Sequence, residues 1–303
     1  MSRRDTALAL VVVLLWGANF VVIDVGLAEV PPLLFLAMRF VLVALPAVFL
    51  VPRPSADWRL VLGIGAFLSL GQFSLLYAAL AAGMPAGLAS LVLQVQVLFT
   101  AVISALALRE RPTPRQFAGI ALGLAGLGVV IAGQAQAVPL LPVVLTLGAA
   151  LSWATGNVLA RRAKVASGLS LVVWSALVVP LPALALSLVF EGPAEIGAAI
   201  AGFGWPALLS TLYTVIAASL VGYGIWNGLL SRHPSSAVVP FALLVPVVGL
   251  LTAWVAQGEV PPVTTLVGGA VMVLGLAVIT VRWGRRAAAP VPRSAAASPS
   301  AVE

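Results

Sequence analysis

The sequence contains no cysteine and few charged residues. Its 303 residues include 16 Lys and Arg, 9 Asp and Glu, and one His. Only 8% of the chain is charged, whereas a typical soluble domain has about 25%. The absence of cysteine excludes disulfides, Cys-ligated metals and thiol catalysis. The scarcity of charge excludes water-soluble enzymes, nucleic-acid-binding proteins and disordered proteins.

Apolar residues make up 62% of the chain, and its mean hydropathy is +1.15. Because a spanning helix uses about 20 residues, we expect an all-α integral membrane protein with ten transmembrane helices. Apolar runs, cut at charge, Pro and Gly clusters, predict these helices near residues 6–25, 31–51, 58–81, 85–108, 114–133, 139–160, 169–190, 204–230, 235–256 and 261–282. Residues 285–303, rich in Pro, Ala and Ser, are predicted to form a disordered cytoplasmic tail.

The charged residues are segregated along these predicted spans. Every Lys and Arg except Arg39 falls on the side that carries the N-terminus. The opposite segments hold five acidic residues, namely Asp24, Glu29, Glu191, Glu195 and Glu259. The positive-inside rule therefore predicts that both termini are cytoplasmic. The net charge of +7 then reflects topology and not binding to nucleic acid.

The two halves of the sequence share a pattern. A shift of 149 residues (234 − 85) aligns Pro85 with Pro234, Glu110 with Glu259, Pro112 with Pro261, Gly119 with Gly268, and Gly126 with Gly275. A looser match relates Trp16 and Asn19 to Trp153 and Asn157. Each half holds five predicted helices, an odd number, so the second half must be inverted in the membrane. We predict repeats over 1–134 and 135–284, an architecture typical of secondary transporters.

Several segments carry a resemblance to a known family. LLWGANFVVIDVGL (14–27), GMPAGLASLVLQ (83–94), LSWATGNVLARRA (151–163) and VGYGIW (221–226) resemble the EamA branch of the drug/metabolite transporter superfamily. The likeness covers about residues 2–284 and is similar to bacterial exporters of O-acetylserine and cysteine. It implies the drug/metabolite transporter fold, a central cavity and a bacterial inner-membrane location. The chain departs from the family pattern at Asp24, where that pattern has Lys.

Arg39 is the basic residue that lies well inside a predicted span. An Arg at the bilayer centre costs about 2.5–3.5 kcal/mol on insertion scales, so its side chain should face the protein interior and find a partner. One interpretation is that its guanidinium binds a substrate carboxylate. The alternative is a structural role, with Asp24 or the carbonyls of a broken helix as partners.

Amides and aromatic side chains within the spans are the other candidates for substrate binding. They are Asn19, Gln72, Tyr77, Gln94, Trp153, Asn157, Tyr223 and Asn227. For each amide alone, an interhelical hydrogen bond is the more common role. Gln94 and Gln96 are separated by about 200° on a helix, so at most one of them can face a narrow site. Asp24, Glu110 and Glu259 are candidates for coupling or gating.

The sequence therefore predicts a secondary transporter that exports small amino-acid metabolites by alternating access, with O-acetylserine and cysteine as the cargo that the resemblance implies. It contains no ATPase motif, which leaves proton antiport or facilitated efflux. The alternatives are export of aromatic amino acids or lipophilic cations, or a membrane scaffold without transport. The spans lack the convergent Asp, His or Lys groups of an intramembrane enzyme, and no cofactor or metal is predicted.

Overall fold

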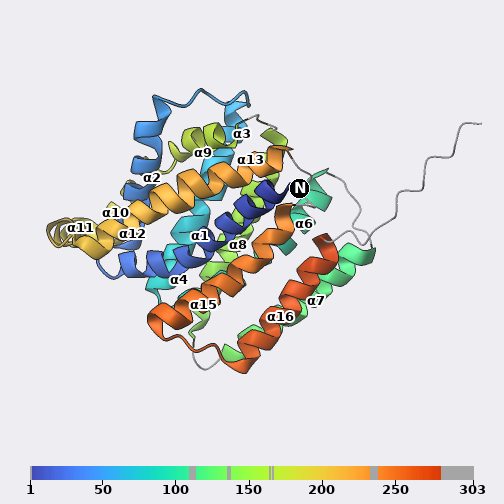
Figure 1. Cartoon of the computed structure of the whole chain (residues 1–303). Helices are drawn as coiled ribbons and strands as arrows, with labels where there is room; N and C mark the ends of the chain where they lie inside the picture. The colour runs from blue at the N-terminus through green and yellow to red at the C-terminus, as the bar shows by residue number, and fades with distance from the viewer. Residues whose placement is uncertain are drawn as a thin grey trace, which may run out of the picture.

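The computed structural model describes residues 2–108, 114–134, 138–163, 165, 167–232 and 238–280, and every regular element within them is helical (Figure 1). The elements are α1 (Arg3–Leu27), α2 (Pro32–Val48), α3 (Trp58–Ile64), η1 (Gly65–Gly71), α4 (Gln72–Ala81), α5 (Ala86–Val92), α6 (Val95–Leu108), α7 (Pro114–Gln134), α8 (Leu140–Ala163), α9 (Gly168–Ala176), α10 (Pro180–Phe190), α11 (Gly192–Ala201), α12 (Trp205–Leu212), η2 (Tyr213–Tyr223), α13 (Gly224–Arg232), η3 (Val239–Leu244), α15 (Val245–Gln257) and α16 (Val263–Thr280). The predicted tail and Glu110 lie outside the described residues.

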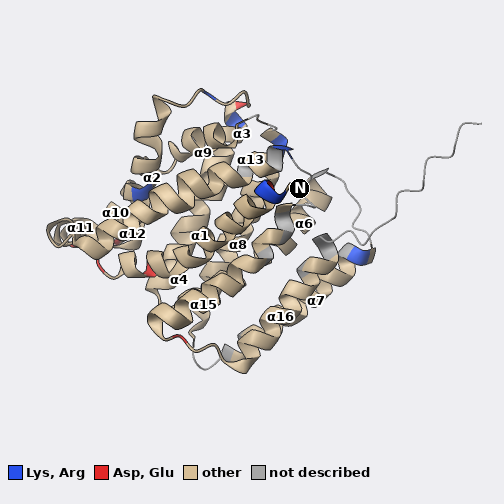
Figure 2. Cartoon of the chain, in the orientation of Figure 1, with Lys and Arg blue, Asp and Glu red and all other residues tan. Residues whose placement is uncertain are grey.

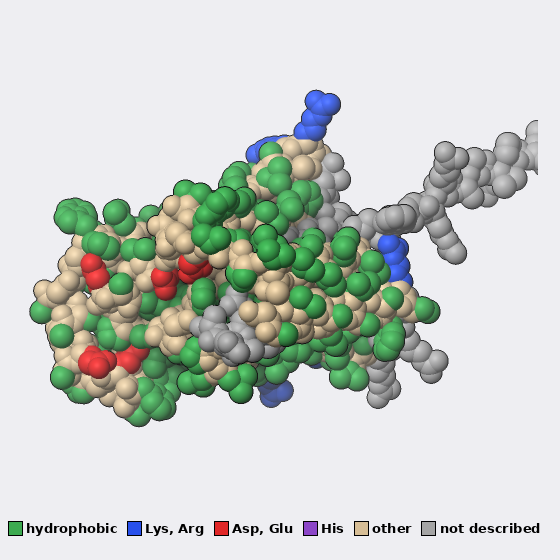
Figure 3. Space-filling view, turned by 90° about the horizontal axis from the view of Figure 1, so that it is seen from below, with side chains coloured by type: hydrophobic (Ala, Val, Ile, Leu, Met, Phe, Trp, Pro, Cys, Tyr) green, Lys and Arg blue, Asp and Glu red, His purple; other side chains and the backbone are tan. Residues whose placement is uncertain are grey.

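Six helical runs of the described chain are long and apolar enough to cross a membrane. They are Arg3–Leu27, Trp58–Ala81, Ala86–Ala107, Leu140–Ala163, Gly168–Phe190 and Trp205–Trp226. Four shorter apolar helices cover Pro32–Val48, Phe117–Val130, Val245–Gln257 and Val263–Gly275. Hydrophobic side chains cover much of the face seen in Figure 3. A surface of this kind is stable in lipid and not in water, so the chain is a multi-pass membrane protein.

Several helices that the sequence predicts as continuous are interrupted. The predicted helix 85–108 breaks at Leu93 and Gln94, where the backbone N–H of Gln94 bonds to the carbonyl of Leu91, three residues back. The predicted helix 169–190 breaks before Pro180, because proline lacks an N–H donor and disfavours a helical conformation in the preceding residue. The predicted helices 58–81 and 204–230 each contain a π-helical stretch, η1 and η2.

The two π-helical stretches occupy corresponding places in the two halves. Adding 149 to residues 65–71 of η1 gives 214–220, which lies within Tyr213–Tyr223 of η2. The repeat was predicted from Pro, Gly and Glu positions, so this agreement is an independent observation. π-Helix is rare and is found frequently at functional sites. The side chains of η1 and η2 are therefore candidates for the functional site.

Helices α7 and α16 lie side by side and pack through glycine (Figure 1). A Cβ added to Gly126 would lie 2.6 Å from the carbonyl oxygen of Gly268, and one added to Gly275 would lie 2.7 Å from that of Gly119. The shift of 149 exchanges Gly126 with Gly275 and Gly119 with Gly268. The shift therefore converts each contact into the other. This is the relation expected for two antiparallel helices that pack about a two-fold axis.

Charge is distributed unevenly along the bundle. Figure 2 shows Lys and Arg mainly toward the end that carries the N-terminus and α3, and most Asp and Glu toward the opposite end, near α12 and the connection from α15 to α16. We refer to these as the basic end and the acidic end. The arrangement matches the segregation seen in the sequence, which predicts a cytoplasmic basic end.

Gly126→Ala should weaken the contact between α7 and α16, because the added Cβ meets the backbone of Gly268 and Met272 at 2.6–2.7 Å. Such overpacking destabilises a protein by about 1–3 kcal/mol. The matched control is Gly128→Ala on the same helix, where an added Cβ meets no atom within 4 Å. Thermal unfolding of the purified variants in detergent should show a lowered midpoint for Gly126→Ala alone. Equal midpoints would contradict the close packing.

Candidate functional site

A cavity lies between the two halves of the chain. We call it the central cavity. Its polar lining residues are Asn19 of α1, Arg39 of α2, Gln72 of α4 and Gln94 of the break between α5 and α6. Its aromatic lining residues are Trp16, Phe20, Phe73, Trp153 and Tyr223. Since both halves contribute walls, a relative movement of the halves would change access to the cavity.

Arg39 is 1% exposed and is held by neutral groups. Its Nη1 donates a hydrogen bond to the Tyr77 hydroxyl at 2.6 Å, and its Nε and Nη2 donate to Ser219 Oγ at 3.1 and 2.9 Å. Its guanidinium carbon lies 4.1 Å from the centre of the Phe73 ring. Within the described part of the chain, no carboxylate forms an ion pair with Arg39. Its positive charge therefore faces the cavity without a counter-ion from these residues.

Asp24, one of the two partners predicted for a structural Arg39, does not contact it. Its Oδ2 instead accepts a hydrogen bond from Gln257 Nε2 at 2.5 Å, near the end of α1 and the end of α15. The described partners of Arg39 are thus hydroxyls and aromatic rings, which stabilise the guanidinium without neutralising it.

Three side-chain amides in the wall of the central cavity keep polar atoms that no described protein group satisfies. They are Asn19 Oδ1, Gln72 Oε1, and both Nε2 and Oε1 of Gln94. These side chains are buried, with Gln94 only 1% exposed. An unsatisfied buried polar atom costs about 1–3 kcal/mol, so four such atoms around one cavity favour a ligand-binding role over a packing role.

Gln94 and Gln96 point to different surroundings. Gln94 lines the central cavity, whereas Gln96 Oε1 accepts a hydrogen bond from Asn157 Nδ2 at 3.0 Å. Asn157 therefore joins α8 to α6 and lies outside the cavity wall, although its counterpart in the other half, Asn19, lies within it. A hydrogen bond between helices is the ordinary function of such an amide.

Aromatic residues form the apolar part of the wall. The rings of Trp16 and Trp153, which the repeat relates, lie 6.4 Å apart, and Tyr223 lies 4.7 Å from Trp16. The Trp16 indole N–H donates to the carbonyl of Ala218 at 3.0 Å. Tyr77 is not part of the cavity wall. Its hydroxyl accepts the hydrogen bond from Nη1 of Arg39. The side chain of Asn227 is not among those described, so its predicted place in the site has no structural account.

At the acidic end, four acidic side chains join the two halves. Glu259 accepts the backbone N–H groups of Ala86 and Gly87, both at 3.1 Å, at the start of α5. Glu191 accepts those of Leu33 and Leu34, Glu29 accepts those of Gly204 and Ala207, and Asp24 bonds to Gln257. Carboxylates are favourable at helix N-termini because they satisfy free N–H donors and face the positive end of the helix dipole.

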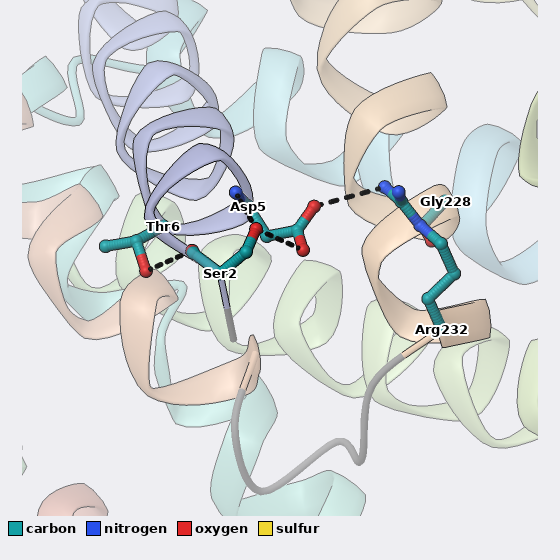
Figure 4. Close-up of polar contacts among 5 residues, drawn as sticks. All are labelled: Ser2, Asp5, Thr6, Gly228 and Arg232. Atoms are coloured by element: carbon teal, nitrogen blue, oxygen red, sulfur yellow. Dashed lines mark hydrogen bonds and ion pairs between the residues drawn. The ribbon is translucent and has the colours of Figure 1, made fainter.

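At the basic end, the halves are joined by different groups. Arg232 Nη2 lies 3.6 Å from Asp5 Oδ1, while Ser2 caps the start of α1 (Figure 4). Arg162 Nη2 also donates to the carbonyl of Ala107 at 3.1 Å. Because the Arg232 side chain is 57% exposed, its ion pair with Asp5 contributes little to stability.

The comparisons with known proteins agree on the family. The model of the EamA-like transporter family matches residues 6–132 and again residues 140–281. A "Probable amino-acid metabolite efflux pump" of Salmonella typhimurium is 46% identical over 282 residues, covering 91% of this chain and 94% of the relative. A protein of the same description from Escherichia coli K12 is 43% identical and covers 93% and 97%. One solved crystal structure, 22% identical, superposes with a TM-score of 0.65 over 92% of this chain and 97% of that one, which shows the fold alone.

Glu259→Ala should destabilise the protein, because the N–H groups of Ala86 and Gly87 lose their acceptor. Loss of a helix cap costs about 0.5–2 kcal/mol. Glu195→Ala is the matched control, since Glu195 is an exposed acidic residue at the same end of the bundle. Thermal unfolding in detergent should show a clearly lower midpoint for Glu259→Ala and a smaller change for Glu195→Ala, which lies in the first turn of α11. An unchanged midpoint for Glu259→Ala would show that this contact does not hold the halves together.

Proposed function

The chain belongs to the EamA-like transporter family, and we propose that it is a secondary transporter that exports small amino-acid metabolites from the cytoplasm by alternating access. Two relatives named as probable amino-acid metabolite efflux pumps support this proposal. A cavity with walls from both halves also supports it, because such a cavity can open to either side as the halves move.

The observation that carries the proposal is the unneutralised guanidinium of Arg39 in the central cavity. An arginine has five N–H donors, of which three are used by Tyr77 and Ser219. A cargo carboxylate would supply both the missing charge and charge-assisted hydrogen bonds. This favours cargo with a carboxylate over lipophilic cations, which Arg39 would repel.

The amide and aromatic side chains of the cavity can bind the parts of an amino acid other than its carboxylate. The unpaired oxygens of Asn19, Gln72 and Gln94 can accept hydrogen bonds from an amino group, and aromatic faces attract ammonium groups. Gln94 can also donate to an ester or carbonyl oxygen. O-acetylserine and cysteine, the cargo that the sequence resemblance implies, have these groups. Aromatic amino acids, which share the same backbone groups, are the second candidates because of the ring-lined wall.

The proposed topology has ten spans in two inverted repeats, over 1–134 and 135–284, with both termini in the cytoplasm and the protein in a bacterial inner membrane. The six long and four shorter apolar helices support the number of spans. The reciprocal glycine contacts of α7 and α16 support the two-fold relation. In this arrangement the acidic end faces outward, and Asp24, Glu29, Glu191 and Glu259 join the halves on the side where cargo leaves.

Uptake into inverted membrane vesicles tests the function. Labelled O-acetylserine, cysteine, phenylalanine and a quaternary cation would be offered under several pH gradients, with vesicles lacking the protein as the control. An exporter accumulates one or more of the amino acids, and dependence on the gradient identifies proton antiport. A scaffold without transport gives no protein-dependent uptake, and a cation exporter accumulates only the quaternary cation.

Arg39→Ala should abolish most transport while the protein still inserts, because a more apolar helix enters the membrane more easily. A lost charge-assisted hydrogen bond corresponds to roughly a ten- to a hundredfold loss of affinity. Arg39→Lys keeps the charge but loses the planar donor pair, so it should retain partial activity. The measurement is uptake per amount of monodisperse protein. Normal specific activity in Arg39→Ala would remove Arg39 from the cargo site.

Gln94→Leu and Gln96→Leu should separate a cargo-binding amide from a structural one. Gln94→Leu removes two unsatisfied buried atoms, so the unfolding midpoint should stay the same or rise while uptake falls by about tenfold. Gln96→Leu leaves Asn157 without its partner, so the midpoint should fall. Uptake assays and thermal unfolding on the same preparations make the comparison. Full uptake by Gln94→Leu would place the cargo elsewhere.

A further inference from the structure

The Ser219 hydroxyl has an unusually complete set of hydrogen bonds. It donates its hydrogen to the carbonyl of Thr214 at 2.7 Å and accepts from Nε and Nη2 of Arg39 at 3.1 and 2.9 Å. A serine hydroxyl has one hydrogen and two lone pairs, so all of its capacity is used. Ser219 is 2% exposed and belongs to the π-helical stretch η2, whereas Arg39 belongs to α2. The contact therefore joins the two halves of the chain.

The edge of Arg39 that Ser219 occupies is one that can bind a carboxylate. The Nε–H and the neighbouring Nη2–H are parallel donors, and a carboxylate can accept both at once. In this structure both point to one neutral oxygen, Ser219 Oγ. The Tyr77 hydroxyl holds Nη1 from another direction and leaves this edge untouched. A carboxylate approaching the edge would compete with Ser219 and not with Tyr77.

The contact between Arg39 and Ser219 lies between two cavities. Arg39 lines the central cavity, and Ser219 lines a second, mainly apolar cavity, which we call the inner cavity. Phe73 and Tyr223 line both. The inner cavity reaches Ala160 of α8, which directly precedes the basic pair Arg161 and Arg162 at the basic end. It is therefore on the side from which cargo would arrive.

We propose that Ser219 is a positioning residue that holds the carboxylate-binding edge of Arg39 while the transporter is empty, and that the cargo carboxylate displaces it. This inference rests on the proposed function, because it requires cargo with a carboxylate. A carboxylate can accept Nε–H and Nη2–H on two separate oxygens and also neutralises the guanidinium, which the single neutral oxygen of Ser219 cannot do, so the exchange is favourable. Displacement breaks the link between α2 and η2 and so couples binding to the separation of the halves on the inner side.

The proposal predicts an unusual direction of change: removing a side chain at the site should tighten binding. In Ser219→Ala the cargo no longer displaces a neutral hydrogen bond, so its Kd should fall about two- to tenfold. Ser219→Thr keeps the hydroxyl and should bind as the wild type does. The effect should be confined to ligands with a carboxylate, because a carboxamide cannot replace Ser219 on the arginine edge with an ionised acceptor.

Isothermal titration calorimetry on the purified full-length chain in detergent tests this, with O-acetyl-L-serine and its carboxamide as the two probes. A lower Kd for the acid in Ser219→Ala, with no change for the carboxamide, supports displacement. Ser219→Cys, nearly isosteric but with a weakly accepting sulfur, should shift the Kd in the same direction and serves where the alanine variant yields little folded protein.

Three results would overturn the inference, and they are distinguishable. Wild-type binding of O-acetyl-L-serine with an equal or higher Kd in Ser219→Ala and Ser219→Cys would refute displacement while leaving the exporter function intact. Equal tightening of acid and carboxamide would also refute it, because the gain would then not arise at the arginine edge. Absence of saturable wild-type binding for both probes would refute the proposed cargo, and the inference with it.

Discussion

A single positive charge inside an apolar bundle is the constraint on which the candidate site depends. Arg39 is buried, and the described groups around it are hydroxyls and rings, not carboxylates. A buried carboxylate in contact with it would form a lasting ion pair and would occupy the donors that a ligand needs. Neutral partners fix the orientation of the guanidinium and leave its charge available. The proposed site would therefore attract anionic groups without having to break an internal ion pair first.

The irregular backbone of the spans lies beside the buried charge of Arg39 or in the wall of the central cavity. Non-helical backbone is tolerated at membrane depth only when it is buried in protein or lines a cavity. The break at Gln94 and the π-helical stretch that carries Ser219 both satisfy this condition, since these residues are 1% and 2% exposed. Each irregularity presents a polar side chain to the Arg39 site or the central cavity, which a regular helix with the same sequence would turn elsewhere.

Much of the fold could be predicted from sequence because it depends on composition and position along the chain. Apolar runs predict the helical class, and the shift of 149 relates Gly126 to Gly275 and Gly119 to Gly268, the four glycines of the two contacts between α7 and α16. Arg39 was identified because a charge in a span needs an explanation. Ser219 was missed, since a hydroxyl in an apolar helix is common and periodicity does not reveal a π-helical turn. Asn19 and Asn157 were grouped by the repeat, although related positions need not face the same cavity.

The net charge of the central cavity determines which cargo the proposed site would reject. Its described lining carries one formal charge, that of Arg39. A zwitterion neutralises that charge with its carboxylate and directs its ammonium group to amide oxygens and aromatic faces, which need no formal negative charge to attract it. A cation without a carboxylate would instead add a second positive charge. At a separation of about 7 Å and an effective dielectric constant of about 20, that repulsion is about 2 kcal/mol, or more than tenfold in affinity. In the proposed site, selection against simple cations would therefore follow from the charge of one residue, while selection among amino acids would depend on the amides and rings of the wall.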